Sequence, residues 1–349
     1  MRPAVLVLLL ALSAPGPSRG QDTPAAAGRE PSPLFRSDQP LAITLTADFR
    51  GGVLKDRDTL SQKRFPATLT WQSGDGDSGS FQVLLSTRGH SRLLPVVCDF
   101  TPLRVHFPDS LPRPALFEGP RSLKLSVNCK PKDAEYRQYV LQEYLIYRSY
   151  QLLTEWSYRT RLVTATYVQA GRGDTIAVTP SFFLEHDDDV ARRNGGTIFE
   201  QPGVRFGDVD STTMLRAALF QYMIGNTDWG LPVLHNIRVV RVDPGFYYPV
   251  PYDFDFSGLI KTRYARPSQK LPITSVRQRL WRGPCTTMDA LIPLFGEFAA
   301  RKDTLLALHR DFPGLDPKRA ASAVEYLEDF FRTIANPKKA EPEFRYVCG

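Results

Sequence analysis

The sequence predicts an α+β protein with two lobes, a β-rich N-terminal half and a mainly helical C-terminal half. Apolar and polar residues alternate in LAITLTADF (41–49) and FPATLTW (65–71), which indicates half-buried strands. The pattern then changes: EYRQYVLQEYLIYRSYQLL (135–153) is a long apolar run without Gly or Pro, which predicts a helix. A length of 349 residues is sufficient for two lobes.

The N-terminus has the pattern of a secretory signal peptide. Arg2 supplies the positive start, Ala4–Leu12 the apolar stretch, and Ser18 and Gly20 the small residues before a cleavage site at Gln21. The apolar stretch is too short to span a bilayer, so no transmembrane segment is expected after cleavage. We therefore expect a secreted or periplasmic protein, with bacterial-type export; an uncut membrane anchor is the alternative.

The remaining chain is expected to divide into three segments. These are a flexible Ala- and Pro-rich linker (21–40), a β-rich region (41–183) and a helical region (184–349). In the helical region, Ser211 is a plausible cap of a helix that ends at Gly225, and two further helices are expected at 286–310 and 317–335.

Composition and cysteine content exclude several classes of protein. With 42% apolar and 23% charged residues, extensive disorder is excluded, and a net charge of +7 without a basic stripe gives no support to nucleic-acid binding. In an exported protein the four cysteines are expected to form disulfides, for which three pairings exist. We favour Cys98–Cys129, which joins two strands, and Cys285–Cys348, which ties down the C-terminal tail.

The densest group of polar residues lies in FYYPVPYDFDF (246–256). On a strand, alternate side chains share a face, so Asp253 and Asp255 point the same way, roughly 6.5 Å apart. Two ionised carboxylates on a partly buried surface repel each other unless a cation or hydrogen-bond donors lie between them. The alternative is a structural role, in which they cap a turn or pair with Arg263 or Arg266.

A hairpin is expected to bring an amide to these carboxylates. Asp243-Pro244-Gly245 is a turn signature after HNIRVVRV, and a two-residue loop would place Asn236 opposite Asp253. Pro-Gly suits a type II turn better than the turns that hairpins prefer, so a slipped register remains open. Oxygen ligands of this kind suit Mg²⁺, Mn²⁺ or Ca²⁺ better than zinc. We expect Mg²⁺ or Mn²⁺, with Asn236, Asp253 and Asp255 as the metal ligands.

The order of the polar residues carries further information. Asp228 lies in the loop before the hairpin, and catalytic Asp, metal-binding Asn and metal-binding Asp follow one another in this order in protein kinases. Such a site also requires an earlier Lys and Glu. Glu143 lies in an apolar helical stripe and needs a cationic partner, for which Lys124 in SLKLSVN is suitable; an unrelated buried ion and a surface lysine are the alternative.

Over roughly residues 80–260 the chain resembles the spore-coat CotH family of atypical secreted kinases, whose fold is distantly related to that of HipA-like kinases. The motifs that carry the resemblance are STRGHSR (86–92), LKLSVN (123–128), QEYLIYRSYQLL (142–153), FFLE (182–185), GNTDW (225–229) and DFDF (253–256). The resemblance implies a two-lobed protein-kinase-like fold and an ATP site. The resemblance further implies that Asp228 is the catalytic residue and that Asn236 and Asp253 bind the metal ion. Lys124 would hold the phosphates of the nucleotide, and Glu143 would orient Lys124. Glu185 would lie near the hinge, beside the nucleotide base.

The sequence departs from the family pattern at several positions. Asp228 and Asn236 are eight residues apart, so Asn226 or His235 could take the role of the Asn. Arg88 in STRGHSR could bind a phosphate or support its strand.

The expected activity is Mg²⁺/Mn²⁺-dependent phosphoryl transfer from a nucleoside triphosphate to a protein or small-molecule acceptor. A kinase-like scaffold without catalysis and a metal-dependent phosphoester hydrolase are the alternatives.

Overall fold

The structure is a computed structural model that describes residues 30–242 and 245–345. The predicted signal peptide, most of the predicted linker, two residues of the hairpin turn and Cys348 lie outside the described residues. Among the described helices, none combines the length and the apolar character that crossing a bilayer requires.

The N-terminal half of the described chain closes into a seven-stranded barrel with the order β1-β2-β3-β4-β5-β7-β6. Its strands are β1 (Leu41–Ala47), β2 (Phe65–Gln72), β3 (Ser78–Thr87), β4 (Leu103–His106), β5 (Ser122–Ser126), β6 (Thr160–Gln169) and β7 (Thr175–Leu184). Neighbouring strands are antiparallel, except that β1 pairs with β6 in parallel, with Leu41 opposite Val163. This parallel pair closes the sheet.

The closed barrel overturns the predicted two-lobed protein-kinase-like fold. The prediction of strands in the N-terminal half and helices in the C-terminal half is met, but a closed seven-stranded barrel is not the N-lobe of a kinase. Alternation identifies the buried face of each strand, yet it does not determine which strand edges pair. In β1, Leu41, Ile43 and Leu45 are buried in the barrel interior.

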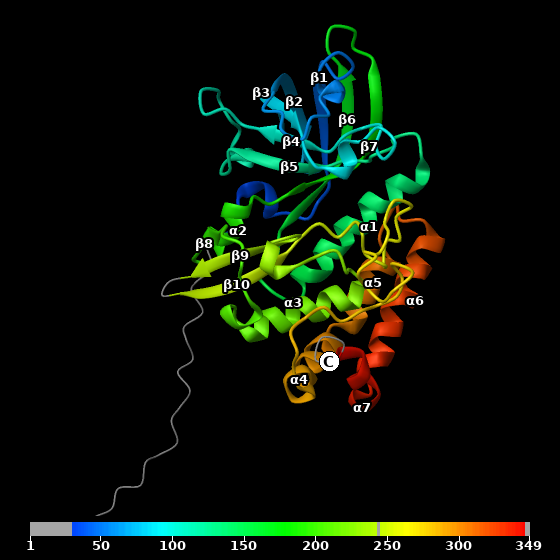
Figure 1. The fold of residues 1–349 in the computed structure, drawn as a ribbon. Coiled ribbons are helices and arrows are strands. Elements are labelled where there is room, and N and C mark those ends of the chain that lie inside the picture. The colour runs from blue at the N-terminus through cyan, green and yellow to red at the C-terminus, as the bar shows by residue number, and fades with distance from the viewer. Residues whose placement is uncertain (1–29, 243–244, 346–349) are drawn as a thin grey trace, which may run out of the picture.

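Helices make up most of the other half, together with a small sheet (Figure 1). The helices are α1 (Ala134–Gln151), α2 (Asp187–Arg193), α3 (Ser211–Ile224), α4 (Met288–Ala300), α5 (Lys302–Arg310), α6 (Pro317–Ile334) and α7 (Pro337–Ala340). The short 3₁₀ turns are η1 (Pro33–Phe35), η2 (Val53–Lys55), η3 (Ser91–Leu93), η4 (Ala115–Phe117), η5 (Phe206–Asp208), η6 (Leu231–Val233) and η7 (Glu341–Phe344). The predicted helix 286–310 is thus two helices.

The two ends of α3 show how local sequence determines where a helix begins and ends in the helical half. Its cap is Asp210, whose side chain accepts a hydrogen bond from Thr213 N, and not Ser211 as predicted. The helix does end at Gly225, which adopts the left-handed conformation with φ of 65°. A Cβ atom at this position would lie 2.0 Å from the hydroxyl of Tyr326 on α6, so the close packing of α6 here also requires glycine.

Strand β7 connects the two halves. Phe183 faces the barrel interior, while Phe182 and Leu184 belong to the core formed by the helices. The Phe182 ring packs against Tyr144 and Tyr147 of α1, with ring centroids 6.1 Å and 5.7 Å apart. Since α1 lies between β5 and β6 in sequence but packs with the helical half, the barrel and the helices share an interface along β7 and α1.

Candidate functional site

The small sheet below the barrel leads directly into the acidic motif, Asp253 and Asp255, which lie beyond its last strand and not on it as predicted. It has the order β10-β9-β8, formed by β8 (Thr197–Phe199), β9 (Ile237–Val242) and β10 (Phe246–Pro251). Ile237 pairs with Pro251, and Tyr252 N donates to Asn236 O over 3.0 Å. Asn236 therefore lies opposite Tyr252 and not opposite Asp253. The predicted register is wrong by one residue, because the hairpin loop is longer than the two-residue loop assumed.

A guanidinium group lies where the sequence predicts a metal ion. Arg92, in η3, places Nη2 at 3.2 Å from Oδ1 of Asp253 and Nε at 3.6 Å from Oδ2 of Asp255. The Tyr264 hydroxyl donates to the same Oδ2 of Asp255 over 3.0 Å. The two carboxylates do converge, as predicted, but on Arg92; they do not pair with Arg263 or Arg266.

Glu143 is buried beside this group. It lines a small cavity together with Arg92, Asp255 and Tyr264. Burial raises the pKa of Glu143 to about 8, against the lowering effect of Arg92. Burial likewise raises the pKa of Asp255 to about 7, again opposed by Arg92. Both carboxyls are thus partly or mostly protonated at neutral pH, which reduces the negative charge around Arg92.

Lys124 pairs with Asp187 and not with Glu143. Its Nζ lies 3.0 Å from Oδ1 of Asp187, and Arg238 Nε lies 3.0 Å from Oδ2 of the same carboxylate. The Tyr158 hydroxyl also donates to Asp187 over 3.1 Å. Burial raises the pKa of Asp187 but its two cationic neighbours outweigh this effect and lower it, so Asp187 is ionised at neutral pH. Asp187 is the first residue of α2, where the helix dipole favours an acidic side chain.

Further cations surround this pair. Arg104 on β4 lies opposite Lys124 on β5, and Arg88 follows the end of β3. Arg88 donates to Ser126 Oγ over 3.4 Å and to Leu103 O over 3.3 Å. Among the described carboxylates, none forms an ion pair with either arginine. We call Arg88, Arg92, Arg104, Lys124 and Arg238 the cationic cluster.

The cationic cluster joins the outer face of the barrel to the small sheet. Tyr252 lies between the two parts: Lys124 Nζ is 5.0 Å and Arg238 Cζ 4.9 Å from its ring centroid. Both distances are typical of cation–π contacts. Strands β3–β5 thus supply one side of the site, and β9–β10 with the start of α2 supply the other.

Asp228 forms a separate polar group at the edge of the site. His235 Nε2 lies 3.1 Å from its Oδ1, and Asn236 Nδ2 donates to Oδ2 over 3.1 Å. The Asp228 and His235 side chains remain 41% and 54% exposed, so both can meet a ligand from solvent. Asn226, the other candidate for the Asn role, accepts from the Asp228 N–H and positions the loop. Asn236 thus contacts Asp228 and adjoins Asp253 through the hairpin.

Left-handed backbone conformations cluster in this region. The described non-glycine residues with positive φ are Leu234, Asn236, Asp253 and Lys261, all between residues 234 and 261. Such conformations persist only where the surrounding structure enforces them, and they concentrate at functional sites. Asn236 and Asp253 adopt this conformation readily, so the uncommon cases are Leu234 and Lys261.

Glu185 lies apart from the site. It is fully buried and forms an ion pair with Arg193, whose Nη2 lies 3.1 Å from Oε2. The same oxygen accepts the Arg159 N–H over 2.8 Å. These contacts hold α2 against the end of β7, so Glu185 has a structural role. The carboxylate beside Lys124 is that of Asp187.

The residues present do not fit a divalent metal ion in this arrangement. Arg92 lies between Asp253 and Asp255, and Asn236 directs its amide nitrogen to Asp228. In the part of the chain that the structure describes, no three acidic, His or Cys side chains group in a way that could hold an ion.

The predicted disulfide Cys98–Cys129 is confirmed and supports the position of Arg92. It joins the segment after η3 to the chain that leads from β5 into α1, across a sequence separation of 31. Asp99 N and Phe100 N both donate to Cys129 O over 3.0 Å. The other expected pair, Cys285–Cys348, includes a residue outside the described part of the chain.

Sequence reasoning did not find Arg92, Asp187 or Arg238, although Arg88 was considered. Arg92 belongs to STRGHSR, where a second arginine so near Gly89 was the available signal. No protein-family model matches this chain, and no curated protein is similar enough to be matched to it.

Proposed function

We propose that this protein binds a phosphate-bearing ligand at the cationic cluster. The observation that carries the proposal is the convergence of five cations from the barrel and the small sheet, only three of which form ion pairs with described carboxylates. Guanidinium groups match the geometry of phosphate oxygens, and lysine adds a compact charge. A nucleoside triphosphate is the form of ligand that the sequence predicts.

Charge favours an anionic ligand. Four carboxyls lie among the five cations, but the raised pKa values of Glu143, about 8, and Asp255, about 7, leave these two incompletely ionised at neutral pH. Burial lowers the pKa of Arg88 only to about 10, so it stays charged. The cluster therefore carries a net positive charge, which a phosphate group would neutralise.

Calorimetric titration tests the proposal. ATP, with and without Mg²⁺, and a non-nucleotide phosphate monoester are titrated into the wild type and Arg238→Gln. We expect a loss of affinity of tenfold or more in Arg238→Gln. Arg241→Gln is the matched control, since Arg241 is an exposed residue of the same strand, and it should bind within twofold of wild type. Absence of binding to wild type in all three titrations would refute the proposal.

Phosphoryl transfer is a second candidate, favoured by one observation. Asp228 is exposed and contacts His235, so its carboxylate is available as a general base at the edge of the site. In such a reaction the bond from phosphorus to the leaving oxygen breaks, a bond to an acceptor hydroxyl oxygen forms, and the hydroxyl proton passes to Asp228. Both products keep their electron pairs, and no redox partner is needed.

Asp228→Asn separates binding from turnover. For transfer, the variant should bind ATP within twofold of wild type but release no nucleoside diphosphate, while the wild type turns over. Phosphate release from simple esters without nucleotide would instead indicate a phosphoester hydrolase. Ligand binding without turnover in either protein would leave the exported scaffold as the function.

A further inference from the structure

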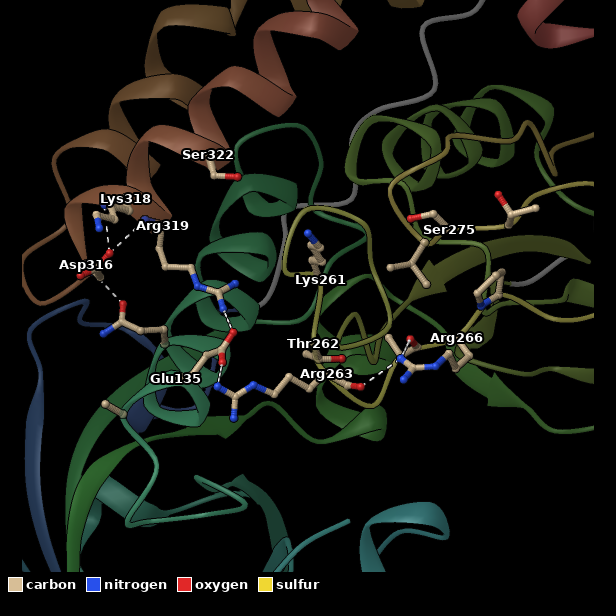
Figure 2. Close-up of a pocket in the computed structure, with 16 residues that line it drawn as sticks. Glu135, Lys261, Thr262, Arg263, Arg266, Ser275, Asp316, Lys318, Arg319 and Ser322 are labelled. Carbon is tan, nitrogen blue, oxygen red and sulfur yellow. Dashed lines mark hydrogen bonds and ion pairs between the residues drawn. The ribbon is translucent and has the colours of Figure 1, made fainter. Parts of the chain in front are cut away.

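A second pocket lies on another face of the helical half. It has a volume of about 890 Å³, within the size range typical of small-molecule sites. Figure 2 shows its walls: the start of α1, the segment that follows the acidic motif, and the first turns of α6. None of its lining residues belongs to the cationic cluster, so the pocket is independent of the proposed function.

The pocket is lined by five cations and two carboxylates. The cations are Lys261, Arg263, Arg266, Lys318 and Arg319. Glu135 forms ion pairs with Arg263 and Arg319, and Asp316 caps α6 by accepting from the backbone N–H groups of Lys318 and Arg319. The acidic groups are therefore already engaged.

Three cations remain without a carboxylate partner among the described residues. Lys261 and Lys318 are exposed, and neither forms a described ion pair. Arg266 donates only to main-chain oxygens, Arg263 O at 3.0 Å and Ala265 O at 2.8 Å, so its charge is not neutralised. Ser275 and Ser322 also line the pocket, and their hydroxyls can supply neutral donors (Figure 2).

Hydrogen bonds from the neighbouring residues fix the pocket wall that carries Lys261. Lys261 has φ of 55°, an uncommon conformation for a residue with a side chain. The next residue, Thr262, donates its hydroxyl to Asp255 O over 3.1 Å, and Arg263 N donates to the Tyr139 hydroxyl over 3.2 Å. The position of Lys261 is thus fixed before any ligand arrives, which lowers the entropic cost of binding.

We propose that this pocket binds a small polyanion with at least two anionic groups, phosphate or carboxylate. Three uncompensated cations spread over two walls suit a ligand with separated charges better than a single anion. Serine hydroxyls and the N–H groups of Arg266 add directional donors, which both phosphates and carboxylates accept.

Titration calorimetry with pyrophosphate and with citrate, at constant ionic strength, tests the proposal. We expect saturable binding of at least one probe, weakened fivefold or more in Lys261→Asn, where asparagine tolerates positive φ. Lys318→Gln, at an exposed position, is a second variant with the same expectation should the first fail to fold. Arg172→Gln, which changes an exposed cation in the β6–β7 turn, and Arg238→Gln in the cationic cluster should bind as wild type does.

Three outcomes would overturn the proposal. The first is that the wild type binds neither probe. The second is that Arg172→Gln weakens binding as much as Lys261→Asn, which would indicate nonspecific attraction to charge. The third is that Arg238→Gln alone abolishes binding, which would assign the probe to the cationic cluster instead. A failure of ATP to bind at that cluster leaves the present proposal unaffected.

Discussion

Arg92 Nη2 lies 3.2 Å from Oδ1 of Asp253, at the position where the sequence predicts a divalent cation. Arg92 thus supplies the positive charge that the two neighbouring carboxylates require. Two acids on one partly buried surface require a positive partner, and a guanidinium satisfies this requirement as an ion would. The sequence predicts a positive partner for these carboxylates and proposes Mg²⁺ or Mn²⁺, whereas the structure places the guanidinium group of Arg92 at that position.

The first prediction concerns the replacement of this arginine. Arg92→Gln leaves Asp253 and the buried Asp255 without their cation, so we expect a loss of unfolding free energy of about 3–5 kcal/mol. The freed carboxylates should then attract Mg²⁺, which should stabilise the variant more than the wild type. Urea unfolding with and without MgCl₂ measures both effects.

Arg64→Gln serves as control for Arg92→Gln, because Arg64 is exposed and lies just before β2, outside the cationic cluster. This control should change stability by less than about 0.5 kcal/mol. Equal stabilisation of wild type and Arg92→Gln by Mg²⁺ would contradict the idea that Arg92 takes the place of a metal ion.

The second prediction is a pH dependence that Glu143 and Asp255 impose. Their pKa values rise to about 8 and about 7 in the folded protein, so each binds its proton more tightly there than in the unfolded chain. Their contribution to stability is therefore present below the unfolded pKa, near 4, and is lost as pH rises towards 8. We expect the wild type to lose on the order of 7 kcal/mol between about pH 5 and pH 9.

Glu143→Gln tests this pH dependence, since glutamine cannot ionise. Its unfolding free energy should fall less than that of the wild type over the same range, as measured by urea unfolding at a series of pH values. Glu118→Gln, at an exposed position, should keep the wild-type profile. If Glu143→Gln and wild type decline in parallel, Glu143 is ionised in the folded protein and the assignment is wrong.

The sequence predicted individual elements better than their arrangement. Alternation in 41–49 and 65–71 identified β1 and β2, and the glycine at 225 marked the end of α3. Closure of the barrel depends on β1 pairing with β6, more than 100 residues later. Such a pairing follows from tertiary packing and leaves no local signature, which is why an open kinase-like lobe was expected.

The candidate site shows the same division. Asp253 and Asp255 converge as predicted, but the strand period behind that prediction does not apply, because both residues lie beyond the end of β10 at Pro251 and Asp253 has a φ of 61°. The contact of Asn236 with Asp228 joins two residues that are close in sequence. Partners from distant segments were missed. Arg92 reaches the acidic pair from η3, just before Cys98 of the Cys98–Cys129 bridge. Asp187 at the start of α2 forms an ion pair with Lys124 of β5.

The third prediction tests the structural position of Glu185. Glu185→Gln removes the buried charge that compensates Arg193 and should lower the unfolding free energy by about 3 kcal/mol. Glu155 is the matched control, because it contacts the same arginine over 3.2 Å but is 68% exposed. Glu155→Gln should cost less than about 1 kcal/mol. The affinity for ATP should stay within twofold of wild type in both variants. A loss of ATP binding in Glu185→Gln alone would show that Glu185 contributes to the binding site.

The last prediction concerns the disulfide that lies close to Arg92 in the sequence. Cys98 and Cys129 are separated by 31 residues, and a cross-link over a loop of this length restricts the unfolded chain. The double variant Cys98→Ser/Cys129→Ser should therefore lose about 3–4 kcal/mol of unfolding free energy, measured by urea unfolding without reductant. Because the bridge also holds the segment after η3 against the start of α1, the variant should share a property with Arg92→Gln.

That shared property is the response to Mg²⁺. If the bridge keeps Arg92 between Asp253 and Asp255, its loss should let the arginine leave and the ion enter, so MgCl₂ should stabilise the double variant more than the wild type. Adding Arg92→Gln to the double variant should then produce little further gain in the Mg²⁺ response, because both changes act on the same pair of carboxylates. Fully additive responses would mean that the bridge stabilises the chain without controlling Arg92.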